Sequence, residues 1–280
     1  TDLAVANWNA EMDRTLFRQV MSLEGPVELL GTWDWNVDLQ HSVVHRETYI
    51  HGNPITARYN LATDAVRVTT ANVGTSGLAV GSITCRSTLT APTNGCVPLN
   101  VMGIGVADPN SIAWIQGRTD GTGSTSDLWF RQYTASAALR GEPFSTWAGP
   151  VDVALGMDYR KDEIEQTADA LQYARAYTIS NRQPLDAALN SIEGFAEVNL
   201  PLVSDSFIES LDLNAAARFT NYSTSGSVTT WKVGMVGQLN SDIRVRGTIS
   251  RDIRAPALIS LFESGASQQQ VVLDPLNNNA

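Results

Sequence analysis

Alternation of apolar and polar residues with a period of two is the feature that most constrains this chain. In LDLNAAARFTNY, every second residue from Leu211 to Phe219 is apolar, and Asp212, Asn214 and Arg218 lie between them. Such a pattern predicts a strand with one apolar and one polar face. No stretch reaches the roughly 18 consecutive apolar residues of a membrane-spanning helix. The sequence therefore predicts an all-β, antiparallel protein.

The expected connections between strands alternate in length. About eight strands are expected, each near the 9 to 11 residues, or slightly more, of a tilted membrane span. Short connections are predicted near 25–32, 140–150, 203–210 and 239–242, and mostly longer ones at 47–126, 166–191, 222–227 and after 253. One connection is an exception to this difference in length, but short-turn and long-loop positions still alternate along the whole chain. Bacterial outer-membrane barrels have this layout of short periplasmic turns and long extracellular loops.

Composition permits a membrane barrel and argues against a nucleic-acid partner. The formal net charge is −10, whereas binding to phosphates requires a basic face. Charged residues make up 17% of the chain, below the roughly 25% of soluble domains. Only helices and closed barrels satisfy every backbone polar group in lipid. A chain without a hydrophobic helix can therefore span a membrane only as part of a barrel.

The predicted first long loop, 47–126, contains both cysteines of the chain. Cys85 and Cys96 lie in TCRSTLTAPTNGCVP, a turn-rich segment that favours a local disulfide in an oxidising compartment over two unrelated thiols. Their spacing does not suit a zinc site. Further on, Asp108 and Pro109 are expected to begin a short helix as its N-cap and first residue. The loop is thus expected to form a small disulfide-linked subdomain.

Neither a metal site nor catalysis is predicted. The histidines His41, His45 and His51 lie near a strand end, where a titrating surface cluster is favoured over metal capture. The sequence lacks a nucleophile elbow, a phosphate loop and a zinc motif. Paired carboxylates can serve glycoside hydrolysis, but nothing gives the one acidic cluster a partner at a defined distance. That cluster comprises Asp162, Glu163 and Glu165. The chain is expected to be no enzyme and to need no cofactor.

Three segments resemble the TonB-dependent outer-membrane receptors, specifically the middle of their barrel. They are GFAEVNLPL, LDLNAAARFTNYSTSGSVTTWKVGMVGQL and IRVRGTISRDIRAPALISLF. The last contains an R-A-P-x-L-x-x-L-F motif that is similar to one in receptors of sphingomonad- and caulobacter-like bacteria. CRSTLTAPTNGCVPLNVMGIGVADP is similar to an extracellular loop of the same group. Together these segments extend the resemblance over most of the chain.

The resemblance implies a fold and a function. Residues 1–280 would be a partial barrel domain, about eight strands of a wall of about 22. No plug domain is visible, so a strongly curved open sheet is expected, or alternatively a small closed barrel. Residues 47–126 and 166–191 would be extracellular loops. The implied function is TonB-coupled uptake of a scarce nutrient, such as a ferric siderophore or an oligosaccharide, across the bacterial outer membrane. The implied partners are outer-membrane lipid, the receptor's own plug, TonB through that plug, and a small nutrient ligand.

The polar faces of the strands supply the candidate site residues. Contact with the plug or the lumen is favoured over direct substrate binding, and plain solvation is the alternative. Arg251 and Arg254 would lie where a strand meets a loop, where structural ion pairs are favoured over an anionic ligand such as a ferric chelate. The lumen- or plug-facing candidates are Arg160, Glu193, Glu197, Asp212, Arg218, Lys232, Arg244 and Arg246.

Aromatic residues are expected at two levels, as in the interface girdles of membrane barrels. Trp33, Trp35 and Trp147 lie near short turns. Tyr159, Phe219, Tyr222 and Trp231 lie toward the long loops. Core packing between two sheets is the alternative interpretation of these residues.

Two other functions are compatible with the alternation. A passive porin-like channel would share the strands and the loop rhythm. A soluble β-rich binding module would instead need a second layer of protein over Leu211, Leu213, Val233 and Ile243. The covering of that apolar face therefore discriminates between a membrane barrel and a soluble module.

Overall fold

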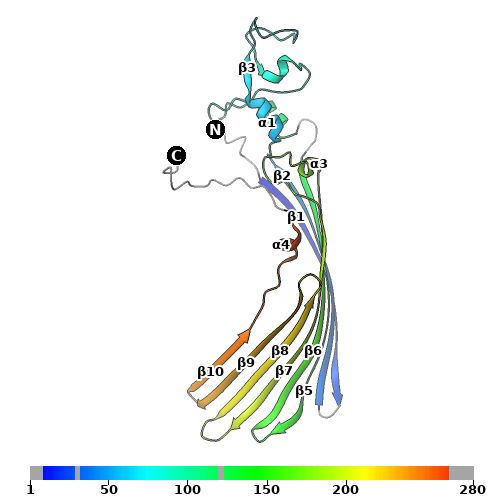
Figure 1. Ribbon diagram of the computed structural model, residues 1–280, viewed down its shortest axis with the longest axis vertical. Helices are drawn as coiled ribbons and strands as arrows, with labels where there is room; N and C mark the ends of the chain where they lie inside the picture. Colours follow the sequence, from blue (N-terminus) through cyan, green and yellow to red (C-terminus); the bar gives the residue numbers. More distant parts are fainter. Residues whose placement is uncertain (1–8, 29–31, 119–122, 265–280) are drawn as a thin grey trace.

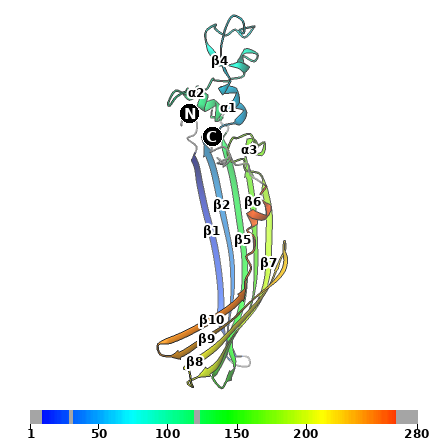
Figure 2. The ribbon, with the colours of Figure 1, turned by 60° about the vertical axis from the view of Figure 1, so that its left-hand side comes forward.

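The computed structural model describes residues 9–28, 32–118 and 123–264, and its main feature is one antiparallel sheet of 8 strands. The strands follow one another as a meander, and the sheet is strongly curved and open (Figures 1 and 2). The expected open sheet is thereby confirmed, and the alternative of a small closed barrel is wrong. The strands are β1 Asn9–Glu28, β2 Thr32–His51, β5 Ser124–Thr146, β6 Gly149–Ala168, β7 Leu185–Ser204, β8 Ser210–Tyr222, β9 Gly226–Asn240 and β10 Ile243–Arg251.

The pairing register gives the sheet two distinct faces. Leu213 lies opposite Leu200 on β7 and Met235 on β9, and we call their side the apolar face. Side chains alternate along a strand, so the neighbouring Asp212 and Asn214 lie on the other side, the polar face. In the described part of the chain the apolar face is open to its surroundings: large side chains remain exposed in its middle, including Met157 (65%) on β6 and Ile192 (56%) on β7, and at its edge, as Val245 (55%) on β10 does. The second layer that a soluble module needs is not observed there.

The ends of the sheet differ as the sequence predicts. At the short-turn end, the connections comprise residues 147–148, 205–209 and 241–242. At the long-loop end, β2 and β5 are joined through 52–123, and β6 and β7 through 169–184. The size exception is the link between β8 and β9, only 223–225, which closes on Gly226 with a φ of 76°. A left-handed φ of this kind is one that glycine adopts readily.

Five strands are longer than the sequence indicates. β1, β2, β6 and β7 each have 20 residues and β5 has 23. Toward the long-loop end, beyond Tyr133 and Tyr159, the apolar side becomes charged while hydrogen bonding continues. Without an apolar residue at every second position, the period-two signal is lost there. This charged strip comprises His45, Glu47, Asp127, Arg131, Lys161, Glu163 and Glu165.

The connection between β2 and β5 folds into a small subdomain beyond the end of the sheet (Figure 1). The expected disulfide between Cys85 and Cys96 is present, and Asp108 caps the second helix by accepting a hydrogen bond from Asn110 N, as predicted. A core of Ala62, Leu99, Ile112 and Ile115 holds the subdomain together. Its elements are α1 Thr56–Thr63, β3 Ala65–Arg67, β4 Ile83–Cys85, the 3₁₀ helix η1 Arg86–Leu89 and α2 Pro109–Ile115.

Two further helices lie near the long-loop end of the sheet. α3 (Ala170–Tyr173) belongs to the connection 169–184. α4 (Leu258–Phe262) follows β10 and packs on the polar face, where Leu258 joins a buried cluster with Leu128, Ile164 and Leu185. Among the described residues, no helix has the length and apolar character needed to cross a membrane.

Candidate functional site

The polar face carries all eight charged residues predicted to face a lumen or a plug. The register places them on this one side because each lies opposite another polar-face residue on a neighbouring strand. Their contact with a plug or a lumen stays a prediction. The residues are Arg160, Glu193, Glu197, Asp212, Arg218, Lys232, Arg244 and Arg246.

A chain of hydrogen bonds crosses the polar face from β1 to β6. Arg18 Nε donates to Gln40 Oε1 (3.1 Å), Gln40 Nε2 donates to Gln132 Oε1 (3.3 Å), and Gln132 Nε2 donates to Asp162 Oδ1 (3.0 Å). Arg160 completes it with an ion pair to Asp162 at 2.8 Å. We call these five residues the polar belt. Its first three links each join neighbouring strands.

A second charged group lies beside the belt on β6, β7 and β8. Arg218 Nη1 is 2.8 Å from Glu193 Oε2 and 3.4 Å from Asp158 Oδ2. Its guanidinium also lies 4.9 Å from the centre of the Phe195 ring, a cation–π contact. A side chain at Gly156 would collide with that ring. Arg218 thus separates two carboxylates that would otherwise repel each other.

Replacing Arg218 with leucine is expected to lower the free energy of unfolding by about 1–2 kcal/mol, because Asp158 and Glu193 lose their shared cation. The matched control is Arg246→Leu. Arg246 lies on the same face, and in the described residues it forms no ion pair. The measurement is chemical unfolding of both variants in lipid vesicles, and equal losses would contradict the assigned role of Arg218.

A partly enclosed cavity of about 400 Å³ lies on the polar face between the sheet and the segment 255–259. Its size falls within the usual range for small-molecule sites, and its lining mixes apolar and charged side chains as such sites do. We call it the upper cavity. It is lined by Phe130, Arg160, Asp162, Ile164, Leu189, Ser191, Glu193, Tyr222, Ala255, Pro256, Ala257, Leu258 and Ile259.

Arginines gather on β1, β2 and the connection 169–184, on the same face as the upper cavity, although none of them lines it. Arg14 and Arg46 lie directly opposite each other on β1 and β2, and Arg46 neighbours Leu128 on β5. Arg182, from the connection 169–184, also repels Arg46 and forms an ion pair with Glu263 at 3.6 Å. Arg14, Arg46 and Arg182 form the arginine patch, whereas Arg18 lies four residues from Arg14 along β1 and belongs to the polar belt.

No carboxylate of the described chain pairs with Arg14, Arg18 or Arg46, and the Nε of Arg46 is buried without a hydrogen-bond partner. On β1 and β2, the carboxylates of the polar face begin only at Asp38, nearer the short-turn end. The patch therefore carries an excess of positive charge that an anion would offset. Sequence reasoning missed it because Arg14 and Arg46 are far apart along the chain.

A wider groove of about 780 Å³ occupies the polar face toward the short-turn end. Its lining includes Asp34, Arg140, Glu197 and Lys232. Asn199 Nδ2 donates to Asp152 Oδ2 at 3.1 Å within it. The groove therefore presents charged residues of both signs.

The acidic cluster singled out in the sequence is divided between the two sides of the sheet. Asp162 lies on the polar face in the belt, whereas Glu163 and Glu165 point to the other side of the sheet. There they pair with Lys161 (2.6 Å) and Arg131 (3.4 Å), respectively. Because neighbouring residues of a strand face opposite sides, Asp162 cannot share a substrate with Glu163 or Glu165.

The three histidines lie on one side of β2 but do not meet one another. His41 stacks on Tyr133 and His45 stacks on Trp129, while His51 pairs with Glu11 at 2.9 Å. The expected single cluster of histidines is therefore wrong. An extended strand separates residues four apart by about 13 Å.

The structure also locates the junction arginines and the aromatic residues. Arg251 ends β10 on the apolar side and Arg254 follows it, and neither forms an ion pair with another described residue. Tyr222 ends β8 at the long-loop end, as predicted, and lines the upper cavity on the polar face. An even-numbered position on β8 always lies on the side of Arg218 and Thr220, since the period is two.

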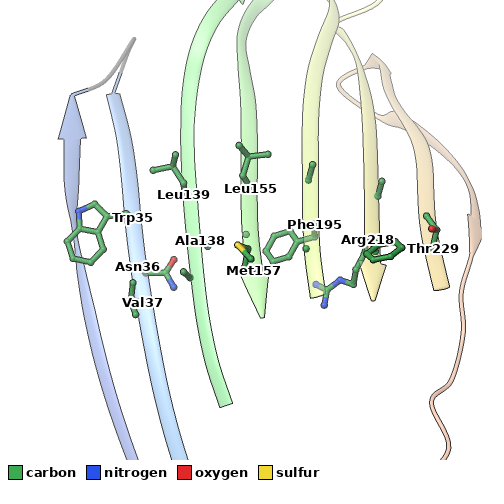
Figure 3. A pocket seen from close by; sticks show the side chains of 16 residues that line it. Trp35, Asn36, Val37, Ala138, Leu139, Leu155, Met157, Phe195, Arg218 and Thr229 are labelled. Atoms are coloured by element: carbon green, nitrogen blue, oxygen red, sulfur yellow. The ribbon is translucent and has the colours of Figure 1, made fainter. Parts of the chain in front are cut away.

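The apolar face has a shallow groove of about 650 Å³, and most of its lining residues belong to that face (Figure 3). Large side chains such as Trp35, Leu139, Leu155 and Met157 border it, and small ones such as Ala217 form its floor. An uncovered surface of this extent and composition is unusual for a soluble monomer.

The β-barrel model of the family described as "TonB dependent receptor-like, beta-barrel" matches residues 6–279. The chain belongs to this family. TonB-dependent receptors are bacterial outer-membrane proteins with transport function, and the family is not one of enzymes. No curated protein and no solved structure was found to match the chain. The receptor and the porin-like alternative share the alternation and the loop rhythm, so these features cannot discriminate between them. The family match does, in favour of the receptor.

Proposed function

We propose that this TonB-dependent receptor imports an anionic nutrient, such as a ferric chelate with free carboxylate or catecholate groups, across the outer membrane. Lipid covers the apolar face, and the receptor's plug, which TonB moves, contacts the polar face. The wide groove with Asp34, Arg140, Glu197 and Lys232 suits the plug because it offers charges of both signs. The connections 52–123 and 169–184 are the extracellular loops.

The observation that carries the substrate class is the arginine patch on the polar face. Two of its arginines, Arg14 and Arg46, have no carboxylate partner in the described chain, and guanidinium groups bind carboxylates and similar planar anions in a bidentate manner. Leu128 lies directly opposite Arg46 and packs in one cluster with Leu258, which supplies an apolar wall next to the patch. A neutral oligosaccharide, the other nutrient suggested by the resemblance, would gain little from these charges.

The test is equilibrium binding to the receptor purified from outer membranes, with a ferric tricarboxylate chelate as the anionic probe and a neutral oligosaccharide as the comparison. Tighter binding of the chelate, weakening as salt rises, supports the proposal because screening reduces charge attraction. Equal or tighter binding of the oligosaccharide contradicts the substrate class. In a separate measurement on whole cells, uptake of the chelate that persists without TonB contradicts the coupling of import to TonB.

A further inference from the structure

The charged strip contains three side chains with the donor atoms of a metal site. Glu47 on β2 lies directly opposite Asp127 on β5, and His45 lies two residues before Glu47 on the same side of the sheet. One ligand atom from each of these residues lies within 4.8 Å of the others. They come from two hydrogen-bonded strands, so the backbone holds their positions.

The histidine is already oriented for coordination. Its ring stacks on Trp129 with centroids 3.9 Å apart, and its Nε2 lies 3.1 Å from Asp127 Oδ1. Two ligand atoms that each lie about 2.1 Å from a tetrahedral zinc ion are about 3.4 Å apart. The His45–Asp127 distance is close to that value, so only the Glu47 side chain must move to complete three ligands.

The charges around this group also favour a cation. Asp13 on β1 lies opposite Glu47, so three carboxylates are side by side on β1, β2 and β5. Like charges directly opposite each other destabilise a sheet. The nearest cations of the strip are engaged elsewhere: Lys161 pairs with Glu163 and Arg131 with Glu165. Of the basic residues of the strip, this leaves only the imidazole of His45 beside these carboxylates.

We propose that His45, Glu47 and Asp127 bind a divalent transition-metal ion of the zinc type on the outer wall of the receptor. One imidazole with two carboxylates is a donor set that zinc accepts, and Asp13 offers a further carboxylate. The ion offsets the repulsion between β1, β2 and β5 at the level where the apolar band has ended. This site lies on the opposite side of the sheet from the upper cavity and is independent of the transported nutrient.

The experiment is calorimetric titration of the full receptor, purified in detergent, with zinc chloride and separately with calcium chloride. Zinc is expected to bind the unchanged protein with one-to-one stoichiometry and more tightly than calcium, because calcium prefers sites made only of oxygen ligands. His45→Ala is expected to weaken zinc binding at least about tenfold, whereas the control His51→Ala, on the same side of β2, leaves it unchanged.

Before titration, folding of each variant is checked by its resistance to unfolding during gel electrophoresis in detergent. Glu47→Gln serves as a second ligand variant, and it keeps the shape of the side chain. Zinc binding that survives both His45→Ala and Glu47→Gln would overturn the proposal. So would the lack of any zinc binding by the unchanged receptor up to millimolar concentrations, or an equal loss in His51→Ala.

Discussion

Replacing Ala215 with arginine is expected to lower the free energy of unfolding by about 2–4 kcal/mol, the cost measured for cations near the middle of a membrane barrel's lipid face. Ala215 lies on the apolar face between Val198 and Val233, halfway along β8 from Leu211 to Phe219. A guanidinium at this depth has neither water nor a partner within the band. The measurement is reversible unfolding of the receptor in lipid vesicles by denaturant.

The next residue provides the matched control. Ala216→Arg makes the same chemical change one position along, on the polar face, and is expected to alter stability by no more than about 0.5 kcal/mol. Its neighbours across the ladder are Glu197 and Lys232, so attraction and repulsion nearly cancel. Equal costs for both substitutions would mean that the two faces meet the same medium. The membrane assignment of the apolar face would then be wrong.

The faces of the sheet were predictable because they depend on local periodicity alone. Once LDLNAAARFTNY is taken as a strand, Leu213 and Arg218 must point to opposite sides. The cap of α2 by Asp108 is likewise local, since an aspartate before a proline satisfies free backbone N–H groups. The disulfide between Cys85 and Cys96 also follows from a short, turn-rich segment.

The remaining features depend on contacts between distant parts of the chain. The polar belt joins Gln40 to Gln132 across 92 positions, and no pattern within either strand indicates which residues pair. The packing of Leu258 on Leu128 and Ile164 is similarly non-local. The far ends of the long strands were missed for another reason, because KDEIEQ lacks apolar residues at every second position.

The facing arginines of the patch could not be placed from the sequence. A short connection near residues 25–32 was predicted, and its midpoint between residues 28 and 29 would put Arg14 opposite Val43. In the structure the numbers of paired residues add up to 60, as for Asn9 and His51 or Glu28 and Thr32, so Arg14 lies opposite Arg46. A small displacement of the turn changes the register, and with it the residue that faces Arg14.

Reversing one of these charges is expected to have the largest effect on substrate binding. Arg46→Glu should weaken binding of the anionic chelate by at least about 30-fold, because truncating a partner of a desolvated charge pair costs about 2–5 kcal/mol and the new carboxylate adds repulsion. Arg46 is half-buried between Arg14 and Leu128, so water screens its charge less than at the rim. Binding of the radiolabelled chelate to the purified receptor measures the change.

Arg244→Glu is the matched control, since it makes the same charge reversal on the polar face at the short-turn end. It should leave chelate affinity within about twofold, because charges separated by more than the Debye length of about 8–10 Å are largely screened. Equal losses in both variants would mean that the whole face attracts the anion through its overall field. Only a loss confined to Arg46→Glu is consistent with a local site, because contact with a bound anion requires a guanidinium within hydrogen-bond distance.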